Sequence, residues 1–456
     1  DGSPVLTIGR EFHPGTFGKA FGRAVAWEHL IDTVIFRAAT FTQIPLFIKS
    51  LLSYSETVDR IIFLDYDRSL NFSFDLSLYS PDSSLQMDSN IRKWWFVNTS
   101  STLILSFLNA SDQLAKPFDE LLIGRYSFST KDTDKLFDKI KTVPVLHHVP
   151  TLKFVGCKFR TFNYPQFQSV CESFQNLQTL YFKNISNVDG NLLLTAICKA
   201  NCKIHQLSLI KMRFEHVMQA GLNLPKGLVF LDVSKSQFIN LSFASFLWGI
   251  SSRRAAQPFI LNARKLRIGY DEFALLSKIV ISRCHPNFLE VNFSHNNIPT
   301  YNNKRFFDIL AMQSRLKHLV LYDVTTDDPA KLISQIITIL EKSNAEGLDI
   351  GFHFEQTIIR VFLSLLHRCT NLTRLTIKNC AAGNAGLETI CSLFQLLQNL
   401  RELACDGFRP TPMTPEEIEA RPSHLHPLME LWKKIGQSKT IERNDWPTQD
   451  LEMAQL

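Results

Sequence analysis

The stretch that decides the fold is Phe288-Leu-Glu-Val-Asn-Phe-Ser-His-Asn-Asn-Ile298, in which apolar residues recur at a definite, uneven spacing. Counted from Phe288, apolar side chains stand at offsets 0, 3, 5 and 10, and Asn296 stands at offset 8. The stretch that begins at Leu228 has apolar residues at the same offsets. Residues at offsets 3 and 5 lie on one side of a strand, so the spacing predicts a short strand followed by a turn.

The same spacing recurs along most of the chain, with starts 24 to 33 residues apart and about 28 on average. The fourteen starts are Ile31, Val58, Ile91, Phe118, Val149, Leu177, Ile204, Leu228, Pro258, Phe288, Leu316, Ala345, Leu372 and Leu400. A partial further unit begins at Ser3. A unit of this kind cannot bury its apolar side alone, so stacked units are expected to share one continuous core.

The second half of each unit has room for a helix that returns on the opposite side. Apolar i, i+3, i+4 spacing, as in Ile358, Val361, Phe362 and Leu365, predicts helices. Such patterns occupy residues 273–284, 305–313, 330–342, 357–369 and 387–397. Residues 66–90 lack this period, and we expect an irregular loop there. The predicted fold class is α/β: a solenoid, or horseshoe, with a concave parallel sheet and a mostly helical convex side.

These units resemble the leucine-rich repeats of the ribonuclease-inhibitor-like class, in which strand and helix alternate every 28 to 29 residues. In that class an Asn or Cys at offset 8 caps the loop backbone, and Cys157, Asn296 and Cys380 occupy this position here. A long array of this class also looks like the CARMIL family of capping-protein regulators. That resemblance implies a role at the cytoskeleton, and it implies a membrane-binding pleckstrin-like domain before the repeats.

The sequence predicts two domains. Residues 1–410 form the leucine-rich-repeat solenoid, with about 14 to 15 repeats. Three prolines between residues 410 and 415 break the array, and residues 411–456 are expected to form a helical cap followed by a polar tail. Leu428, Leu431 and Trp432 give the second helix of this segment an apolar side, which either covers the last repeat or binds a partner.

Composition narrows the classes of protein. With 45% hydrophobic and 20% charged residues, the chain can bury a core and is not disordered as a whole. A net charge of +6 over 456 residues is too small for a nucleic-acid coat. The apolar runs are too short to span a bilayer.

Nine cysteines, an odd number at mostly core-facing positions, favour reduced thiols and a cytoplasmic location. Because the chain begins at Asp1 within a repeat, we expect it to be a piece of a longer protein, and any membrane contact to be made by domains outside it.

No catalytic motif stands out: the sequence has no Walker loop, no HExxH and no GxSxG. Cys171, Cys198, Cys202 and His205 could be imagined as a zinc cluster, but small thiols in helical returns are better explained as core residues. The sequence therefore predicts a protein that is not an enzyme and holds no cofactor and no metal.

Function is expected on the concave face, where offsets 1, 2, 4, 6 and 7 are not dictated by the core. Offsets 1 and 2 of three consecutive units are apolar except for Glu290, and they predict a protein-binding patch formed by Val229, Phe230, Phe259, Ile260 and Leu289. The alternative is a one-residue shift of register at Pro258, which would bury Phe259. At offset 4, Trp95 and Tyr181 could extend the surface.

A ladder of basic residues stands at offset 7 of four successive units: Lys211, Lys235, Lys265 and His295. Like charges in a row repel one another, and an acidic partner would relieve this repulsion. The alternative is a solvated rim that Asp232 partly neutralises.

The favoured interpretation is a non-catalytic scaffold that binds a protein partner on the concave face, with a possible role as a cytoskeletal regulator of actin capping protein. One alternative is a structural subunit embedded in a large cytoskeletal or ciliary assembly. Another is a substrate receptor of a ubiquitin-ligase-type complex.

Overall fold

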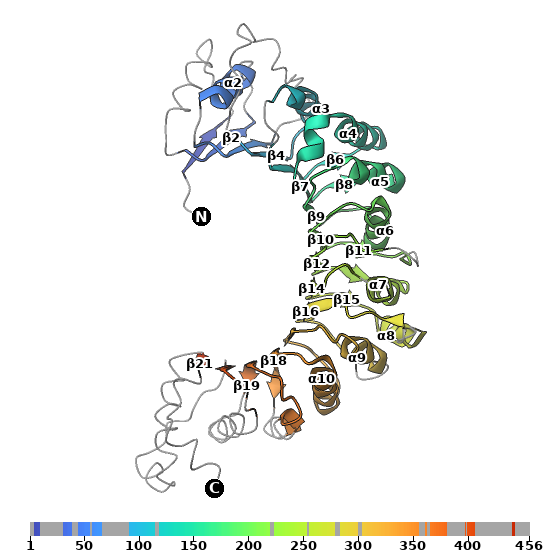
Figure 1. The fold of residues 1–456 in the computed structure, drawn as a ribbon. Helices are drawn as coiled ribbons and strands as arrows, with labels where there is room; N and C mark the ends of the chain where they lie inside the picture. Colours follow the sequence, from blue (N-terminus) through green and yellow to red (C-terminus); the bar gives the residue numbers. More distant parts are fainter. Residues whose placement is uncertain are drawn as a thin grey trace. The chain divides into compact units, whose positions relative to one another are not determined.

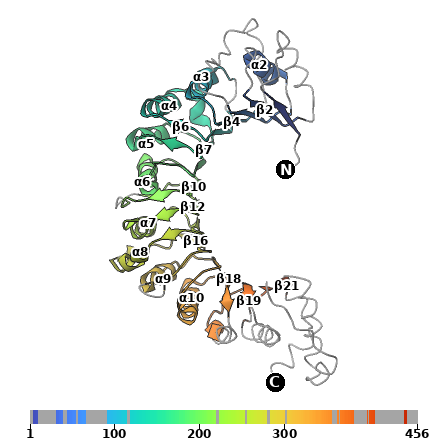
Figure 2. The same ribbon diagram turned by 180° about the vertical axis from the view of Figure 1, so that it is seen from behind.

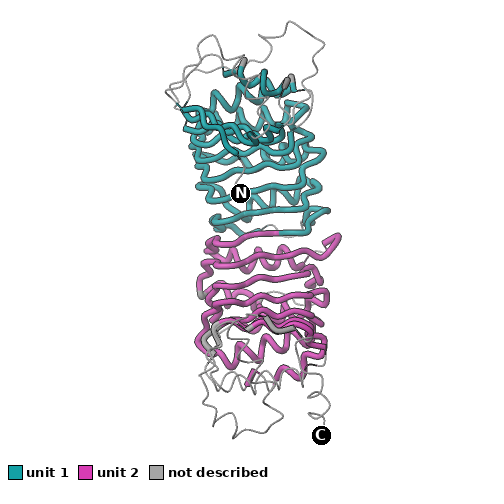
Figure 3. The backbone as a smooth tube through the Cα atoms, turned by 90° about the vertical axis from the view of Figure 1, so that its left-hand side faces the viewer, with its two compact units in different colours: residues 1–230 teal, residues 231–456 magenta. Residues whose placement is uncertain are grey.

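The computed structural model describes residues 4–9, 31–38, 44–54, 57–65, 91–114, 118–218, 223–252, 255–278, 283–299, 303–354, 361–362, 365–380, 397, 399–405 and 440–442. The chain divides into two compact units, which Figure 3 distinguishes by colour. Unit 1 comprises residues 1–230 and unit 2 comprises residues 231–456.

In unit 1 the long strands pair in parallel in chain order: β1 (Val5–Ile8), β2 (Thr33–Arg37), β3 (Arg60–Leu64), β4 (Lys93–Val97), β5 (Glu120–Gly124), β7 (Thr151–Val155), β9 (Thr179–Lys183) and β10 (Gln206–Ile210). Helices return between them: α2 (Ile44–Tyr54), α3 (Ser101–Ala110), α4 (Thr130–Thr142), α5 (Tyr164–Ser173) and α6 (Gly190–Ala200). Short strands β6 (Ser127–Phe128) and β8 (Lys158–Phe159) pair in a second sheet. Helices α3 to α6 lie on one side of the long strands and leave the other side as an open strand face (Figure 1).

Unit 2 repeats this arrangement. Its parallel strands are β14 (Phe259–Asn262), β16 (Phe288–Asn292), β17 (His318–Tyr322), β18 (Gly347–Phe354), β19 (Arg374–Cys380) and β20 (Glu402–Cys405), and β12 (Phe230–Asp232) lies at the unit boundary. Its helices are α7 (Ser242–Ser251), α8 (Tyr270–Leu275), α9 (Lys304–Ala311) and α10 (Pro329–Ser343), and Figure 2 shows them opposite the strands. Strand β21 (Thr440–Glu442) adds to β20 in antiparallel orientation.

The predicted fold class is confirmed: the chain is an α/β leucine-rich-repeat solenoid. A strand lies in every one of the fourteen predicted units, and most of these strands begin two residues after the predicted start. The helical patterns at 305–313 and 330–342 correspond to α9 and α10, and the one at 273–284 overlaps the end of α8.

Other sequence-based predictions fall outside the described residues. They are the irregular loop at 66–90, all but the last residue of the helix at 387–397, residues 357–360 and 363–364 of the helix at 357–369, and the cap formed by Leu428, Leu431 and Trp432. The domain boundary at residue 410 stays a prediction. Residues 440–442, expected within a polar tail, instead form β21 and pair with the last parallel strand.

Aromatic stacking between neighbouring repeats fills the core of unit 1. At offset 5 the ring of Phe63 stacks on Phe36 and on Phe96, with centroids 5.3 and 5.2 Å apart and interplanar angles of 17° and 9°. All three rings are fully buried. Offset stacking of this kind adds to the free energy of burying the rings, so each repeat stabilises the next.

Most of the long strands end in a left-handed residue at offset 7. From Ala38 to Asp323 every unit has a positive φ at this position, between 47° and 65°. The amide of this residue donates to the next repeat, as in Asn98 N to Gly124 O (2.8 Å) and Lys265 N to Ser294 O (2.8 Å). The left-handed turn therefore prolongs the hydrogen-bond ladder while it redirects the chain.

The capping role predicted for offset 8 is confirmed at two of its three positions. The side chain of Asn296 donates to Ala263 O (2.9 Å) and Phe293 O (2.7 Å) and accepts from Leu266 N (2.7 Å). The Cys157 thiol donates to Ile123 O at 3.3 Å. The Cys380 side chain is not among those described.

The substitution Asn296→Ala should lower the free energy of unfolding by about 2 to 3 kcal/mol, because it leaves the Leu266 amide buried without an acceptor. The exposed neighbour Asn297 is the matched control, and Asn297→Ala should cost less than about 0.5 kcal/mol. Urea unfolding followed by circular dichroism measures both. Equal midpoints for the two variants would contradict the capping role.

Candidate protein-binding surfaces

An apolar patch lies on the strand face of unit 1. In each strand offsets 3 and 5 point into the core, and offsets 2, 4 and 6 point to the open side, as the alternating burial of β3, β4 and β7 shows. The patch consists of seven half-buried apolar residues at offsets 4 and 6, and we call it the Trp95 patch: Ile35, Ile62, Leu64, Trp95, Val97, Leu122 and Val155.

The strand register makes the patch continuous. Along offset 4, Ile35 pairs with Ile62, Ile62 with Trp95, and Trp95 with Leu122. Along offset 6, Leu64 pairs with Val97, and Gly124 stands between Val97 and Val155. Neighbouring strands lie about 4.8 Å apart, so the offset-4 side chains lie side by side on four strands, and Val155 lies on the fifth strand beyond Gly124. The core does not need them, since it is filled from the other side of the same strands.

Polar contacts fix the indole of Trp95 at the centre of the patch. Trp95 Nε1 donates to Glu120 Oε1 at 2.7 Å, and Lys153 Nζ binds the other oxygen of the same carboxylate at 2.7 Å. The guanidinium of Arg60 lies 4.4 Å from the centroid of the Trp95 ring. A tryptophan held in this way loses little conformational freedom when a partner binds.

The sequence singled out Trp95 and Tyr181 at offset 4, and both lie half-buried on the strand face of unit 1. It missed the other six members of the Trp95 patch. The sequence does contain this pattern, because offsets 4 and 6 of the units from Ile31 to Val149 are apolar at most positions. The pattern becomes visible only when offsets 4 and 6 of successive units are compared as residues on one face of the sheet.

The predicted exposure of Phe259 is wrong. Phe259 is fully buried and pairs with Phe288, and a bulge between Phe259 and Ile260 shifts the register by one residue. The ring of Phe259 packs edge-on against Phe288, with centroids 5.5 Å apart. Phe259 therefore fills the core position that the spacing assigned to Pro258.

The other members of the predicted apolar patch are accessible. Val229 and Leu289 are each 38% exposed, and Phe230 and Ile260 are half-buried. Val229 and Phe230 belong to unit 1, whereas Ile260 and Leu289 belong to unit 2. Their role as contact residues stays a prediction.

All four residues of the predicted basic ladder are exposed and left-handed. The φ angles are 54° at Lys211, 61° at Lys235, 59° at Lys265 and 58° at His295. Lys211 lies in unit 1 and the others in unit 2. His295 pairs with Asp323 at 3.2 Å, whereas the three lysines form no ion pair with any described residue. The ladder thus follows the row of strand-ending turns, and its binding role stays a prediction.

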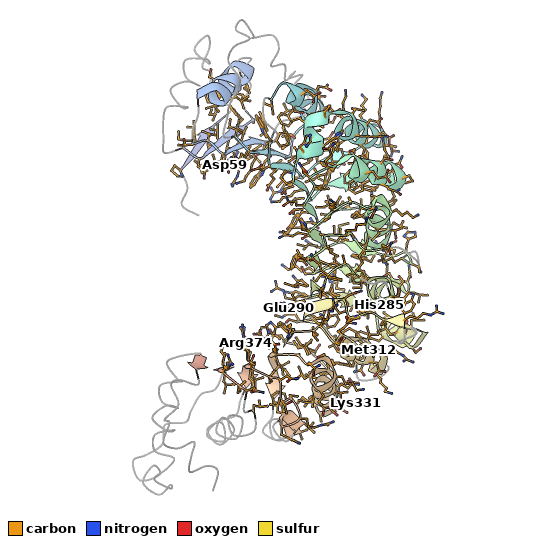
Figure 4. The ribbon with its side chains drawn as sticks, in the orientation of Figure 1. Asp59, His285, Glu290, Met312, Lys331 and Arg374 are labelled. Atoms are coloured by element: carbon orange, nitrogen blue, oxygen red, sulfur yellow. The ribbon has the colours of Figure 1, made fainter. Side chains whose placement is uncertain are left out.

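The strand face of unit 2 carries a cluster of charges instead of an apolar patch. His318 lies between Glu290 (3.6 Å) and Asp349 (3.3 Å), and Arg374 lies between Asp349 (4.0 Å) and Glu402 (3.7 Å). Figure 4 shows Glu290 and Arg374 on the strand side of this unit, and Met312 and Lys331 on its helix side.

The charges of this cluster shift the pKa of its members. Burial opposes the charged form of His318, but its contacts with Asp349 and Glu290 outweigh burial and raise the pKa to about 9. Burial also raises the pKa of Asp349, but His318 and Thr376 outweigh it, so the pKa of this carboxyl is lowered. Gly347 makes room for the imidazole, since a Cβ there would stand 2.8 Å from His318 Cδ2. The cluster is thus a compact network in which three carboxylates pair with two cations.

The cysteines considered as zinc ligands are core residues. Cys171, Cys198 and Cys202 are buried, and burial raises the pKa of the Cys198 thiol to about 12. Within the described ranges, no group of three or more His, Cys, Asp or Glu side chains is placed to hold a metal ion. Among the same residues, no helix has the length and apolar character needed to cross a membrane.

No protein-family model matches this chain, and no curated protein matches it. Solved structures that match include an internalin (inlF) from Listeria monocytogenes, with 16% identity and a TM-score of 0.35 over 69% of this chain and 91% of the internalin chain. Another is TLR13 in complex with ssRNA13, with 12% identity and a TM-score of 0.42 over 87% of this chain. The match spans 60% of the TLR13 chain. The fold assignment rests on the repeat geometry described above.

The substitution Phe259→Ser should destabilise the chain by at least about 3 kcal/mol, because it removes a fully buried ring. Leu289→Ser, at a partly exposed position, should cost less than about 1 kcal/mol. Urea unfolding of the two variants checks the register. A stable Phe259→Ser variant would restore the sequence-based placement of this residue on the surface.

The raised pKa of His318 predicts a loss of stability at alkaline pH. A histidine with a pKa of about 6.5 when unfolded and about 9 when folded stabilises the native state fully below pH 6.5. This contribution disappears as the pH rises through 9. Melting temperatures measured from pH 6 to pH 10 should fall more steeply for the wild type than for His318→Gln. Parallel curves for the two proteins would refute the ion-pair network.

Proposed function

We propose that this chain is a non-catalytic protein-binding scaffold that takes its partner on the strand face of unit 1, centred on the Trp95 patch. The observation that carries the proposal is a group of seven half-buried apolar side chains on five neighbouring strands, at positions that do not face the core. Apolar side chains gathered on one face of a protein mark binding sites more often than scattered ones do.

The composition of the patch supports a protein as the partner. Tryptophan and arginine are the residues most enriched at positions that dominate binding energy, and Arg60 lies over the ring of Trp95. Charged groups surround the patch, with Lys93 paired to Asp59 at 2.5 Å and Lys153 paired to Glu120. Figure 4 labels Asp59 on the strand side of this unit. An apolar centre with a polar rim is the usual anatomy of a protein–protein interface.

The proposal includes a cytoplasmic location. It is supported by the six described cysteines, all of which are buried and form no disulfide.

A narrower role, as a regulator of actin capping protein, rests on the resemblance to the CARMIL family and on the length of the array. It is tested directly by titrating purified capping protein against this chain. Binding that depends on Trp95 would support this role, and no binding at micromolar concentrations would remove it in favour of the alternatives.

Partner binding should depend on the Trp95 patch. Proteins retained by the immobilised chain are identified by mass spectrometry, and the affinity of each purified candidate is then measured. Trp95→Ala with Leu122→Ala should weaken the dissociation constant at least about 30-fold, which corresponds to a loss of about 2 kcal/mol.

The matched control is Val217→Ala, which removes an apolar side chain that is 58% exposed elsewhere in unit 1. This control should change affinity less than about threefold. The circular dichroism of all variants should be unchanged, because the altered positions are not in the core. A partner that loses affinity with Val217→Ala, but not with the strand-face pair, would contradict the proposal.

A further inference from the structure

We infer that a basic edge on unit 1 binds a run of acidic residues in the partner polypeptide, an inference that rests on the proposed function. The edge consists of one exposed cation from each of four consecutive repeats, at or just after the end of the strand: Arg125, Lys158, Lys183 and Lys211.

Arg125, Lys183 and Lys211 lie at one edge of the long sheet, and Lys158 follows three residues after the end of β7, in the short second sheet. Lys183 pairs with Val155 and Ile210 on the neighbouring strands, and Lys158 forms a bridge with Ser186 of the next repeat. Arg125 and Lys211 occupy the left-handed position at the end of their strands, with φ of 51° and 54°. Gly156 occupies the same left-handed position in the repeat after Arg125 and adds no side chain there, and its backbone lies beside the stem of Arg125.

The charges of this edge are unbalanced, in contrast to four other cations on or next to strands of the same sheet. Arg37, Arg92, Lys93 and Lys153 all form ion pairs with carboxylates of unit 1. The four residues of the basic edge form none with any described residue. Arg213 follows the edge in the next loop and is already paired with Glu215. Four cations without an ion pair to any described residue therefore remain at the strand ends or within three residues after them, and two of the four occupy left-handed turns.

The geometry defines the chemistry of the ligand. Four rungs at about 4.8 Å span about 14 Å, and an extended chain covers this distance with four to five residues. A run of Asp and Glu residues of that length places several carboxylates within reach of the four cations. The edge adjoins the Trp95 patch, because Val155 pairs with Lys183. An acidic run next to apolar residues would therefore contact both surfaces.

A polypeptide fits this surface better than a nucleic acid does. Arg60 lies over the ring of Trp95, so this ring is not free to stack on a base.

The test uses the whole chain and a fluorescein-labelled peptide of five glutamates followed by two leucines. Binding is followed by fluorescence anisotropy at 50 and 200 mM salt. The wild type should bind the peptide, more weakly at the higher salt, and should not bind the same peptide with glutamine in place of glutamate. Arg125→Glu with Lys183→Glu should weaken binding at least tenfold at 50 mM salt.

The matched control is Lys135→Glu with Lys141→Glu, which makes the same change in net charge on helix α4. It should weaken binding less than twofold. A neutral pair, Arg125→Asn with Lys183→Gln, guards against misfolding, because asparagine accepts the left-handed conformation. This pair should weaken binding at least threefold.

Three outcomes would overturn the inference: equal effects of the two charge-reversed pairs, equal binding of the glutamine peptide, or tighter binding of a ten-nucleotide RNA through the same residues. The inference and the proposed function can fail separately. If a partner needs Trp95 but is insensitive to Arg125 and Lys183, only the inference fails. If the peptide binds as expected but no partner depends on Trp95, only the proposed function fails.

Discussion

The constraint on which the structure depends is that no single repeat can bury its own apolar side chains. Offsets 0, 3 and 5 of each strand reach a core that exists only where the neighbouring repeat supplies the facing side chains. The stack of Phe36, Phe63 and Phe96 shows this directly, since each ring packs on the equivalent ring of the next repeat. Burial of these side chains also fixes the register of neighbouring strands. The register in turn decides which residues lie next to one another on the strand face, opposite the core.

Because the core is satisfied from one side, the strand face is free to differ from one part of the array to another. In unit 1 it carries an apolar patch with an ordered tryptophan, and a row of cations follows at the strand ends. In unit 2 it carries a network in which His318 and Arg374 form ion pairs with Glu290, Asp349 and Glu402. Covering an apolar surface with a partner lowers the free energy of the complex. Covering a network of ion pairs first costs the free energy of removing water from its charged groups. This difference favours unit 1 as the site of partner binding.

The fold was predictable from the sequence because its signal is local and repeated. The offsets of the core residues predicted a strand in each unit, and the short spacing predicted parallel neighbours. The bulge at Phe259 was not predictable, since Pro258 and Phe259 can both be aligned with offset 0 and only packing against Phe288 decides between them. The lysines at offset 7 stood out by their charge, but their backbone conformation could not be inferred from residue type. The Trp95 patch was missed because it belongs to no single repeat: its members meet only once five strands are in register.

The most direct measurement is site-specific photo-crosslinking from the two faces of unit 1. A benzoylphenylalanine is placed at Leu122 on the strand face in one variant and at the exposed Val217 in another. Both are irradiated in an extract of the cells that express the protein. The account predicts a discrete crosslinked product from position 122, suppressed when Trp95 is also replaced by alanine, and none from position 217. A product from position 217 with none from position 122 would contradict it.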